Sequence, residues 1–271
     1  MGLLWAIRSC GLKTKRIFAF SLGSLFLLVI LAWFLLVIVM PEPHGLGLGK
    51  TEVGQLTKRA KEGSGEACWC LSLYYMKDDE QALYWLKKGV TYGNSSAQYH
   101  MYSILANKNP DKAVDALELL KKSAIQDNVY AQNELGDLYR DGKIVERNWD
   151  QAEYFYRQAG RNGYKPAMYN LAKLLTEKSS KKATLVEAYK WSVIALFLSH
   201  EKSVFADDLR KQMDLIIEKA AKLQYEKRSL VSTAESMAAE EGKLIRHVDD
   251  LPDYLGACKK LGEDLRDVGS K

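Results

Sequence analysis

The sequence predicts an all-α fold: a right-handed superhelical solenoid of about four helical-hairpin repeats with capping helices, preceded by one transmembrane helix. Three observations lead to this prediction. A pattern of small and apolar residues recurs in four copies along the middle of the chain. Within the copies, the apolar residues follow helical spacing, and glycines mark the helix ends of the clearest one. A long apolar run without charge precedes the first copy.

The clearest copy runs from Ala131 to Gly163. Leu135, Leu138 and Tyr139 form the apolar stripe of a first helix, and Gly142 ends this helix because glycine readily adopts the left-handed conformation of a C-terminal cap. A second helix carries a second stripe, made of Ala152, Phe155, Tyr156 and Ala159. A lone hairpin cannot bury both stripes, so it requires further copies stacked against it.

Three further copies align with this one. The first helices align at Ala67, Ala97, Ala131 and Ala167. The second helices align at Ala82, Ala116, Ala152 and Ala188, with spacings of 34, 36 and 36 residues. Three positions later stand Trp85, Leu119, Phe155 and Trp191. Four hairpins are therefore predicted over residues 65–94, 95–128, 129–164 and 165–200.

The central copy resembles a Sel-one-like repeat, a relative of the tetratricopeptide repeat. The residues that match the family pattern are Ala131, Leu135, Gly136, Tyr139, Gly142, Val145, Ala152, Phe155, Ala159 and Gly163. Ile144 and Asn148 depart from it, since glycine and aspartate are usual there. Members of this family share no common reaction, so the resemblance implies a scaffold or adaptor.

The ends of the chain are assigned by composition. Residues 1–16 are basic and 17–40 are apolar without charge, and these 24 residues are long enough to span the roughly 30 Å hydrocarbon core of a membrane. The basic flank favours a cytoplasmic N-terminus, which places the rest of the chain in the periplasm of a bacterium with the anchor in its inner membrane. Residues 41–51 form a linker, 52–225 the solenoid and 226–271 capping helices, the last beginning at Pro252.

Charge argues against a nucleic-acid partner. Removing Arg8, Lys13, Lys15 and Arg16 from the 39 Lys and Arg leaves 35, against 34 Asp and Glu. The predicted periplasmic part is thus nearly neutral, without the basic footprint that nucleic-acid binding requires.

Cys68 and Cys70 stand two residues apart on a predicted helix, so their side chains point in different directions and cannot readily bond to one another. In an oxidising compartment, one of them could pair with Cys258. Two buried free thiols are the alternative.

No catalytic motif, metal-ligand spacing or phosphate-binding loop stands out, and we expect neither a cofactor nor a metal. The histidines are scattered. The acidic pairs Asp78-Asp79, Asp207-Asp208 and Asp249-Asp250 fit helix starts or solvated faces better than acid–base catalysis. A non-enzymatic binding protein is therefore predicted.

The analogy to tetratricopeptide repeats places a row of first-helix residues on the concave face of the solenoid. This predicted row consists of Trp69, Leu73, Met76, Tyr99, Ser103, Asn133, Asp137, Arg140, Tyr169, Lys173 and Thr176. Tryptophan and tyrosine are common anchors at interfaces, so the row predicts a protein-binding face. The alternative is that these aromatic residues fill gaps between repeats.

The resemblance also suggests a class of partner. Membrane-anchored proteins with this repeat are partners of toxic phospholipase effectors delivered by type VI secretion, which implies an immunity protein. An envelope assembly or stress-response adaptor is the alternative, and an enzyme with an unrecognised site is a third.

Overall fold

A computed structural model gives the structure of residues 48–108, 111–199 and 203–242. The predicted transmembrane helix at 17–40, most of the linker and the helix from Pro252 lie outside these residues. Within the described ranges, no helix has the length and apolar character needed to cross a membrane. The described residues all belong to one compact unit, His44–Lys271.

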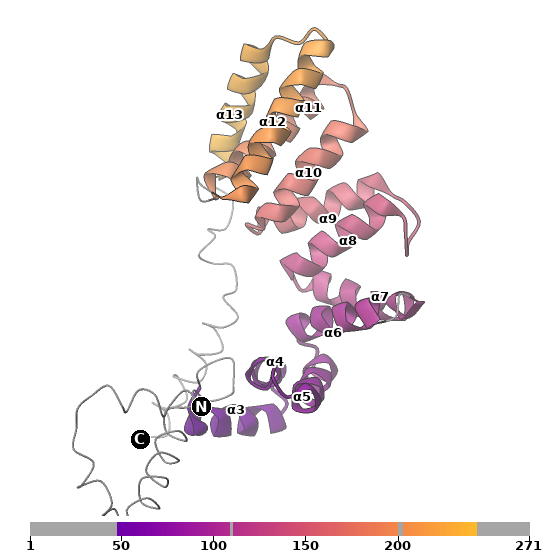
Figure 1. Cartoon of the computed structure of the whole chain (residues 1–271), viewed down its shortest axis with the longest axis vertical. Helices are drawn as coiled ribbons and strands as arrows, with labels where there is room; N and C mark the ends of the chain where they lie inside the picture. Colours follow the sequence, from indigo (N-terminus) through magenta and orange to yellow (C-terminus); the bar gives the residue numbers. More distant parts are fainter. Residues whose placement is uncertain (1–47, 109–110, 200–202, 243–271) are drawn as a thin grey trace, which may run out of the picture. The chain divides into compact units, whose positions relative to one another are not determined.

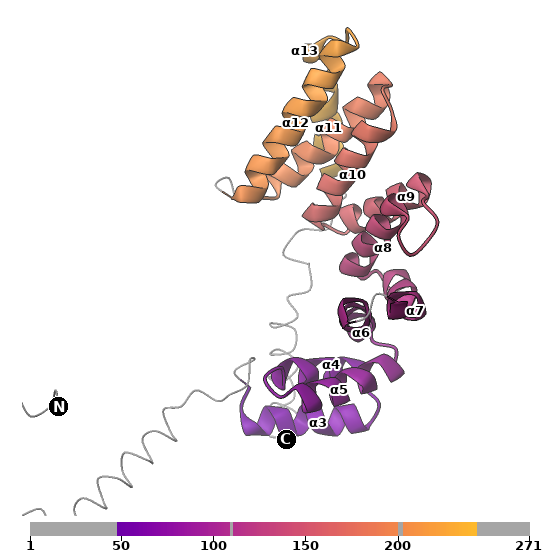
Figure 2. The ribbon, with the colours of Figure 1, turned by 45° about the vertical axis from the view of Figure 1, so that its right-hand side comes forward.

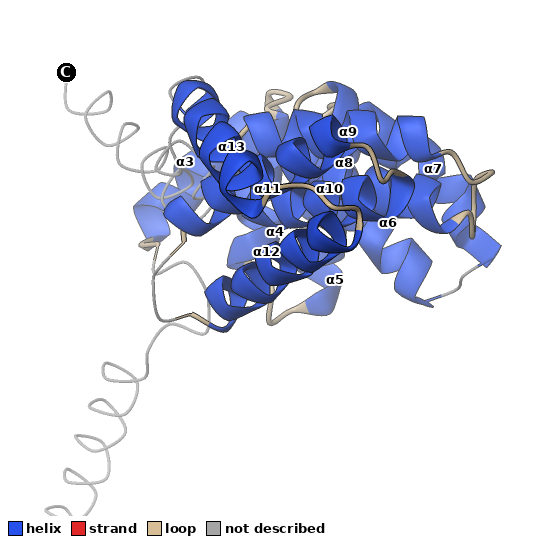
Figure 3. Ribbon diagram, turned by 90° about the horizontal axis from the view of Figure 1, so that it is seen from above, coloured by secondary structure: helices blue, strands red, loops and turns tan. Residues whose placement is uncertain are grey.

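The described part of the chain is helical, with no strand (Figure 3). Its helices are α3 (Lys50–Lys61), α4 (Gly65–Tyr74), α5 (Asp79–Thr91), α6 (Ser95–Lys108), α7 (Asp111–Ile125), α8 (Val129–Asp141), α9 (Trp149–Arg161), α10 (Lys165–Lys178), α11 (Lys182–Phe197), α12 (Val204–Lys222) and α13 (Lys227–Gly242).

These helices form four hairpins, each helix packed against the next one in the chain (Figures 1 and 2). The hairpins are α4–α5, α6–α7, α8–α9 and α10–α11, at the positions predicted from the sequence. Helix α3 packs on α4 before the first hairpin, and α12 and α13 both pack on α11 after the last. The prediction of an all-helical repeat fold with flanking helices is confirmed for this part of the chain.

Small residues occupy the contacts between helices. Ala67, Ala97, Ala131 and Ala167, the aligned first-helix alanines, are each 0% exposed. The apolar core continues from hairpin to hairpin as three clusters of buried residues in the described part, the largest of which joins α9, α10 and α11 to α12 and α13. This arrangement follows from the requirement that each hairpin bury its apolar stripes against its neighbours.

The third hairpin buries the two aromatic residues of its predicted second stripe to different extents. The matched aromatic Phe155 is only partly buried, whereas Tyr156 is fully buried. Tyr156 packs against Gly136 on α8, where an added Cβ would lie 2.5 Å from the tyrosine Cδ1 and Cε1 atoms. Glycine at position 136 therefore makes room for the ring of Tyr156.

Three of the hairpin junctions use a left-handed glycine. Gly63, Gly93 and Gly163 have φ of +100°, +76° and +83°. At the equivalent junction between the second and third hairpins, Asp127 adopts φ of +58°. Aspartate tolerates this conformation better than most other residues, which explains why the glycine pattern is broken there without loss of the turn.

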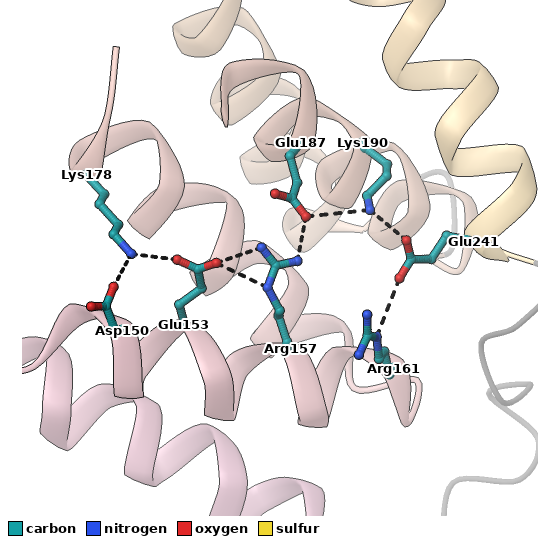
Figure 4. A network of polar contacts seen from close by, with 8 residues as sticks. All are labelled: Asp150, Glu153, Arg157, Arg161, Lys178, Glu187, Lys190 and Glu241. Carbon is teal, nitrogen blue, oxygen red and sulfur yellow. Dashed lines mark hydrogen bonds and ion pairs between the residues drawn. The ribbon is translucent and has the colours of Figure 1, made fainter. Parts of the chain in front are cut away.

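A chain of ion pairs connects the last two hairpins to α13 (Figure 4). Lys178 Nζ lies 2.5 Å from Asp150 Oδ1 and 2.8 Å from Glu153 Oε2. Arg157 pairs with Glu153 at 2.7 Å and with Glu187 at 2.5 Å.

The chain of ion pairs continues through Lys190, whose Nζ lies 2.7 Å from Glu241 Oε2 on α13 and 3.8 Å from Glu187. Although burial opposes the charged form, hydrogen bonds from Arg157 hold the pKa of Glu187 below its usual range. The side chain of Lys190 is only 4% exposed, and these two carboxylates supply the opposite charge beside its ammonium group.

Gly136→Ala should lower the free energy of unfolding by about 1–3 kcal/mol, because the added methyl group overlaps the ring of Tyr156. The matched control is Gly54→Ala on α3, where no atom lies within 4 Å of the added Cβ. This change should instead stabilise the protein by about 0.5–1 kcal/mol, through the higher helix propensity of alanine. Denaturant unfolding measures both, and equal effects would contradict the packing described here.

Lys190→Met should destabilise the protein by about 1–3 kcal/mol, because it removes the buried cation between Glu241 and Glu187, which keep their contacts with Arg161 and Arg157. Lys222→Met is the matched control, since Lys222 is 73% exposed in its pair with Glu218 and should contribute at most about 1 kcal/mol. Denaturant unfolding and hydrogen exchange along α13 test this. Unchanged protection of α13 in Lys190→Met would show that the ion pairs do not hold this helix.

Candidate protein-binding face

The first helices of successive hairpins carry rings in mutual contact. The ring centroids lie 4.5 Å apart for Trp69 and His100, 5.5 Å for His100 and Tyr99, 5.8 Å for Tyr99 and Tyr130, and 5.1 Å for Tyr130 and Tyr164. We call these five residues the aromatic row. It crosses α4, α6 and α8 and ends at the residue before α10, so it connects all four hairpins.

Tyr164, the last member of the row, stands where the earlier hairpins have a capping residue. At the starts of α4, α6 and α8, the side chains of Ser64, Asn94 and Asn128 accept hydrogen bonds from backbone N–H groups. Tyr164 holds the same place before α10 and makes no such bond. Its ring packs edge-on against Tyr130 instead. Helix α10 therefore lacks a capping hydrogen bond, which typically adds about 1 kcal/mol to the stability of a helix, and has an aromatic ring at this position instead.

Two carboxylates of α8 lie beside the row. Asp137 is held on three sides: Tyr156 Oη donates to it at 2.8 Å, Asn133 Nδ2 donates at 3.1 Å, and Arg140 Nη1 pairs with it at 3.0 Å. Asn170 of α10 donates to Asn133 at 3.1 Å, which ties this group to the next hairpin. The buried core tyrosine therefore reaches the face through its hydroxyl group.

The second carboxylate, Glu134, accepts a hydrogen bond from Tyr102. Burial, and then the nearby charge of Asp137, raise the pKa of Glu134 above its usual value. Burial and the charge of Glu134 also raise the pKa of Tyr102 to about 12. Among the described residues, no lysine or arginine forms an ion pair with Glu134.

The structure brings part of the predicted row together. Tyr99, Asn133, Asp137 and Arg140 lie within this group, and Ser103 joins it through a hydrogen bond with Tyr99. Tyr169 packs against Phe205 of α12, with ring centroids 6.1 Å apart. Leu73 is partly buried and packs against the core cluster that α3, α4, α5 and α6 form, which we call the first core cluster. Met76 and Lys173 are exposed.

Two predicted face residues are buried. Trp69 is 4% exposed and belongs to the first core cluster, packed against the ring of His100. Thr176 is 5% exposed, because α12 covers it: Gln212 donates to its hydroxyl at 3.3 Å, and Lys219 donates to its carbonyl. For Trp69, the alternative interpretation of an aromatic side chain that fills a gap between repeats describes its packing.

Several residues of the face were not predicted. Tyr130 and Glu134 were missed because the predicted positions counted only from Leu135, although their spacing of four residues places them on one helix face. Tyr164 had a signal in the sequence, since asparagine precedes the helix at the equivalent place of two earlier copies. No sequence pattern distinguishes Asn170.

The described residues contain no group of three or more His, Cys, Asp or Glu placed to hold a metal ion. His100 lies between Trp69 and Tyr99, and burial lowers its pKa. The acidic residues Asp78 and Asp207 lie at helix starts, as predicted, with Asp78 capping α5. The face therefore offers aromatic rings, amides and carboxylates for binding.

The two neighbouring cysteines have different states. Cys68 is a buried free thiol whose pKa is raised by burial. Cys70 is disulfide-bonded, and its partner lies outside the described residues. The prediction that one of the two cysteines is disulfide-bonded is thus assigned to Cys70, and the predicted partner, Cys258, lies outside the described residues.

The Sel1 repeat family model matches residues 71–91, 92–128 and 129–164, which include the copy identified from the sequence. The aromatic row, except Trp69, lies within these matched residues. No curated protein matches the chain in sequence.

One solved structure supports the fold, and a second is similar over part of the chain. A protective antigen of uropathogenic Escherichia coli strains, which displays an SLR fold, is 19% identical with a TM-score of 0.60, over 86% of this chain and 47% of the antigen. The chain thus spans about half the length of that protein. A Sel1 repeat protein from Oxalobacter formigenes is 21% identical over 54% of this chain and 64% of its own, with a TM-score of 0.46.

An immunity protein from Pseudomonas aeruginosa is 21% identical over 76% of this chain and 82% of its own. Its TM-score of 0.38 is too low for the likeness to bear on function.

Glu134→Gln should raise the free energy of unfolding at neutral pH. A carboxyl group with a raised folded-state pKa lowers stability as pH rises from its unfolded-state pKa through the folded-state value, and the amide removes this cost. The variant should therefore gain stability over the wild type above this pH window and not below it. Glu118→Gln, on an exposed surface, serves as the control and should show no such gain. Urea unfolding at several pH values tests the sign.

Proposed function

We propose that this protein is a membrane-anchored periplasmic immunity protein that binds and neutralises a lipase or phospholipase effector of type VI secretion. The observation that carries a binding role is the group of partly exposed rings of Tyr99, Tyr130 and Tyr164 with the two carboxylates, which the folded chain holds in place across three hairpins. A preformed surface lowers the ordering entropy that association costs. The immunity role rests on the resemblance of the repeats to those of membrane-anchored immunity proteins.

The location is part of the same proposal. The uncharged run at 17–40, with its basic flank, supports an inner-membrane anchor with the repeats in the periplasm. The disulfide bond of Cys70 also fits an oxidising compartment, because disulfides persist there and are rare in the cytoplasm. Periplasmic placement would put the repeats where a delivered phospholipase meets its lipid substrate.

The test of function is neutralisation. A lipase-like effector encoded beside this gene, directed to the periplasm, should kill cells that lack this protein and spare cells that make it. Purification from the membrane fraction should recover the effector in a stable complex. Recovery of envelope biogenesis factors alone, without protection, would contradict immunity and favour an envelope adaptor.

Topology is tested separately. Alkaline phosphatase fused after residue 60 should be active, and a reporter that works only in the cytoplasm should be inactive at the same position, because the anchor directs the residues after it across the membrane. Activity of the cytoplasmic reporter alone would contradict the periplasmic location and leave the binding role to be judged by neutralisation.

A further inference from the structure

In the described part of the chain, one carboxylate of the candidate face is without an ion-pair partner. Asp137 is paired with Arg140, which also contacts Asp141 at 2.9 Å, and Lys143 lies 3.1 Å from Asp141. The cations of this region are thus engaged around Asp137 and Asp141. Glu134 accepts a hydrogen bond from the hydroxyl of Tyr102, and the charged group that acts on it most is another carboxylate.

The surroundings of Glu134 are aromatic. Tyr102 of α6 donates a hydrogen bond to Glu134, and the rings of Tyr99 on α6 and Tyr164 before α10 both contact Tyr130. Tyr130 stands one helical turn before Glu134 and stacks on Tyr99 with an interplanar angle of 26°. Three consecutive hairpins therefore contribute rings around one half-buried carboxylate.

The chain has this arrangement although local structure and stability favour other residues at positions 134 and 164. A serine or asparagine at position 164 would cap α10 as in the earlier hairpins, and glutamine at position 134 would avoid burying a charge beside Asp137. Local rules are commonly broken where a site needs a particular group. An incoming cation would stabilise the carboxylate and also contact the ring faces.

We infer that the face binds an arginine side chain of the partner protein, with the guanidinium group paired with Glu134 and packed against the rings of Tyr99, Tyr130 and Tyr164. This inference rests on the proposed protein-binding function and names the chemistry of the partner. A planar guanidinium stacks on aromatic rings and forms two parallel hydrogen bonds with a carboxylate. A lysine ammonium group is more strongly hydrated and lacks this planar geometry.

The probe for this inference is N-acetyl-argininamide, titrated into the full-length chain labelled with 3-fluorotyrosine. The ¹⁹F resonances of Tyr99, Tyr130 and Tyr164 are assigned by single Tyr→Phe changes. We expect saturable shifts of these three resonances, while Tyr84 and Tyr154, exposed on α5 and α9, do not move. N-acetyl-citrullinamide, a neutral isostere, should bind about tenfold more weakly or worse, because it cannot pair with the carboxylate.

Glu134→Gln is the decisive variant, since it keeps the shape of the side chain and is expected to fold more stably. It should weaken argininamide binding about tenfold, whereas Glu118→Gln should leave it unchanged. Equal binding of citrullinamide, equal binding of N-acetyl-lysinamide, or unchanged binding in Glu134→Gln would each overturn the inference. If the effector is neutralised as well by Glu134→Gln as by the wild type, the arginine site is wrong and the immunity function stands.

Discussion

The contact between Tyr156 and Gly136 connects the core of the repeat scaffold to its candidate face. The ring of Tyr156 fills the space that glycine leaves between α8 and α9. Its hydroxyl then donates to Asp137 at 2.8 Å, which fixes a carboxylate that Arg140 and Asn133 also hold. Packing inside one hairpin and charge on its surface therefore depend on the same side chain.

The ion pairs that connect α9, α11 and α13 and the carboxylate Glu134 of the candidate face differ in how burial affects them. The ion pairs that end at Glu241 place each buried charge beside an opposite one, and hydrogen bonds from their partners lower the pKa of Glu153 and Glu187 despite burial. On the candidate face, burial dominates and the pKa of Glu134 is raised. The ion pairs hold α9, α11 and α13 together. On the candidate face, burying the carboxylate of Glu134 beside Asp137 lowers the stability of the fold, and folding alone does not explain why a carboxylate is there.

The aromatic row shows how a repeat protein forms a continuous surface from separate units. Each ring belongs to a first helix or to the residue before it, and stacking between hairpins brings the rings within about 6 Å of one another. The register of the hairpins sets these contacts. The row therefore depends on the small residues, such as Ala97 and Ala131, that allow the helices to approach closely.

The sequence by itself determined the helices, the four hairpins and the small residues at their contacts, because the spacing of alanines and apolar residues records a pattern that each unit repeats. It also determined the acidic helix starts, since those depend on neighbours in the chain. Only the tertiary structure decided that Tyr156 is fully buried while Phe155 is partly buried, that α12 covers Thr176, and that Trp69 is buried. Only the tertiary structure joined Glu134 to tyrosines of three hairpins, because which side chains meet across hairpins depends on how the units stack.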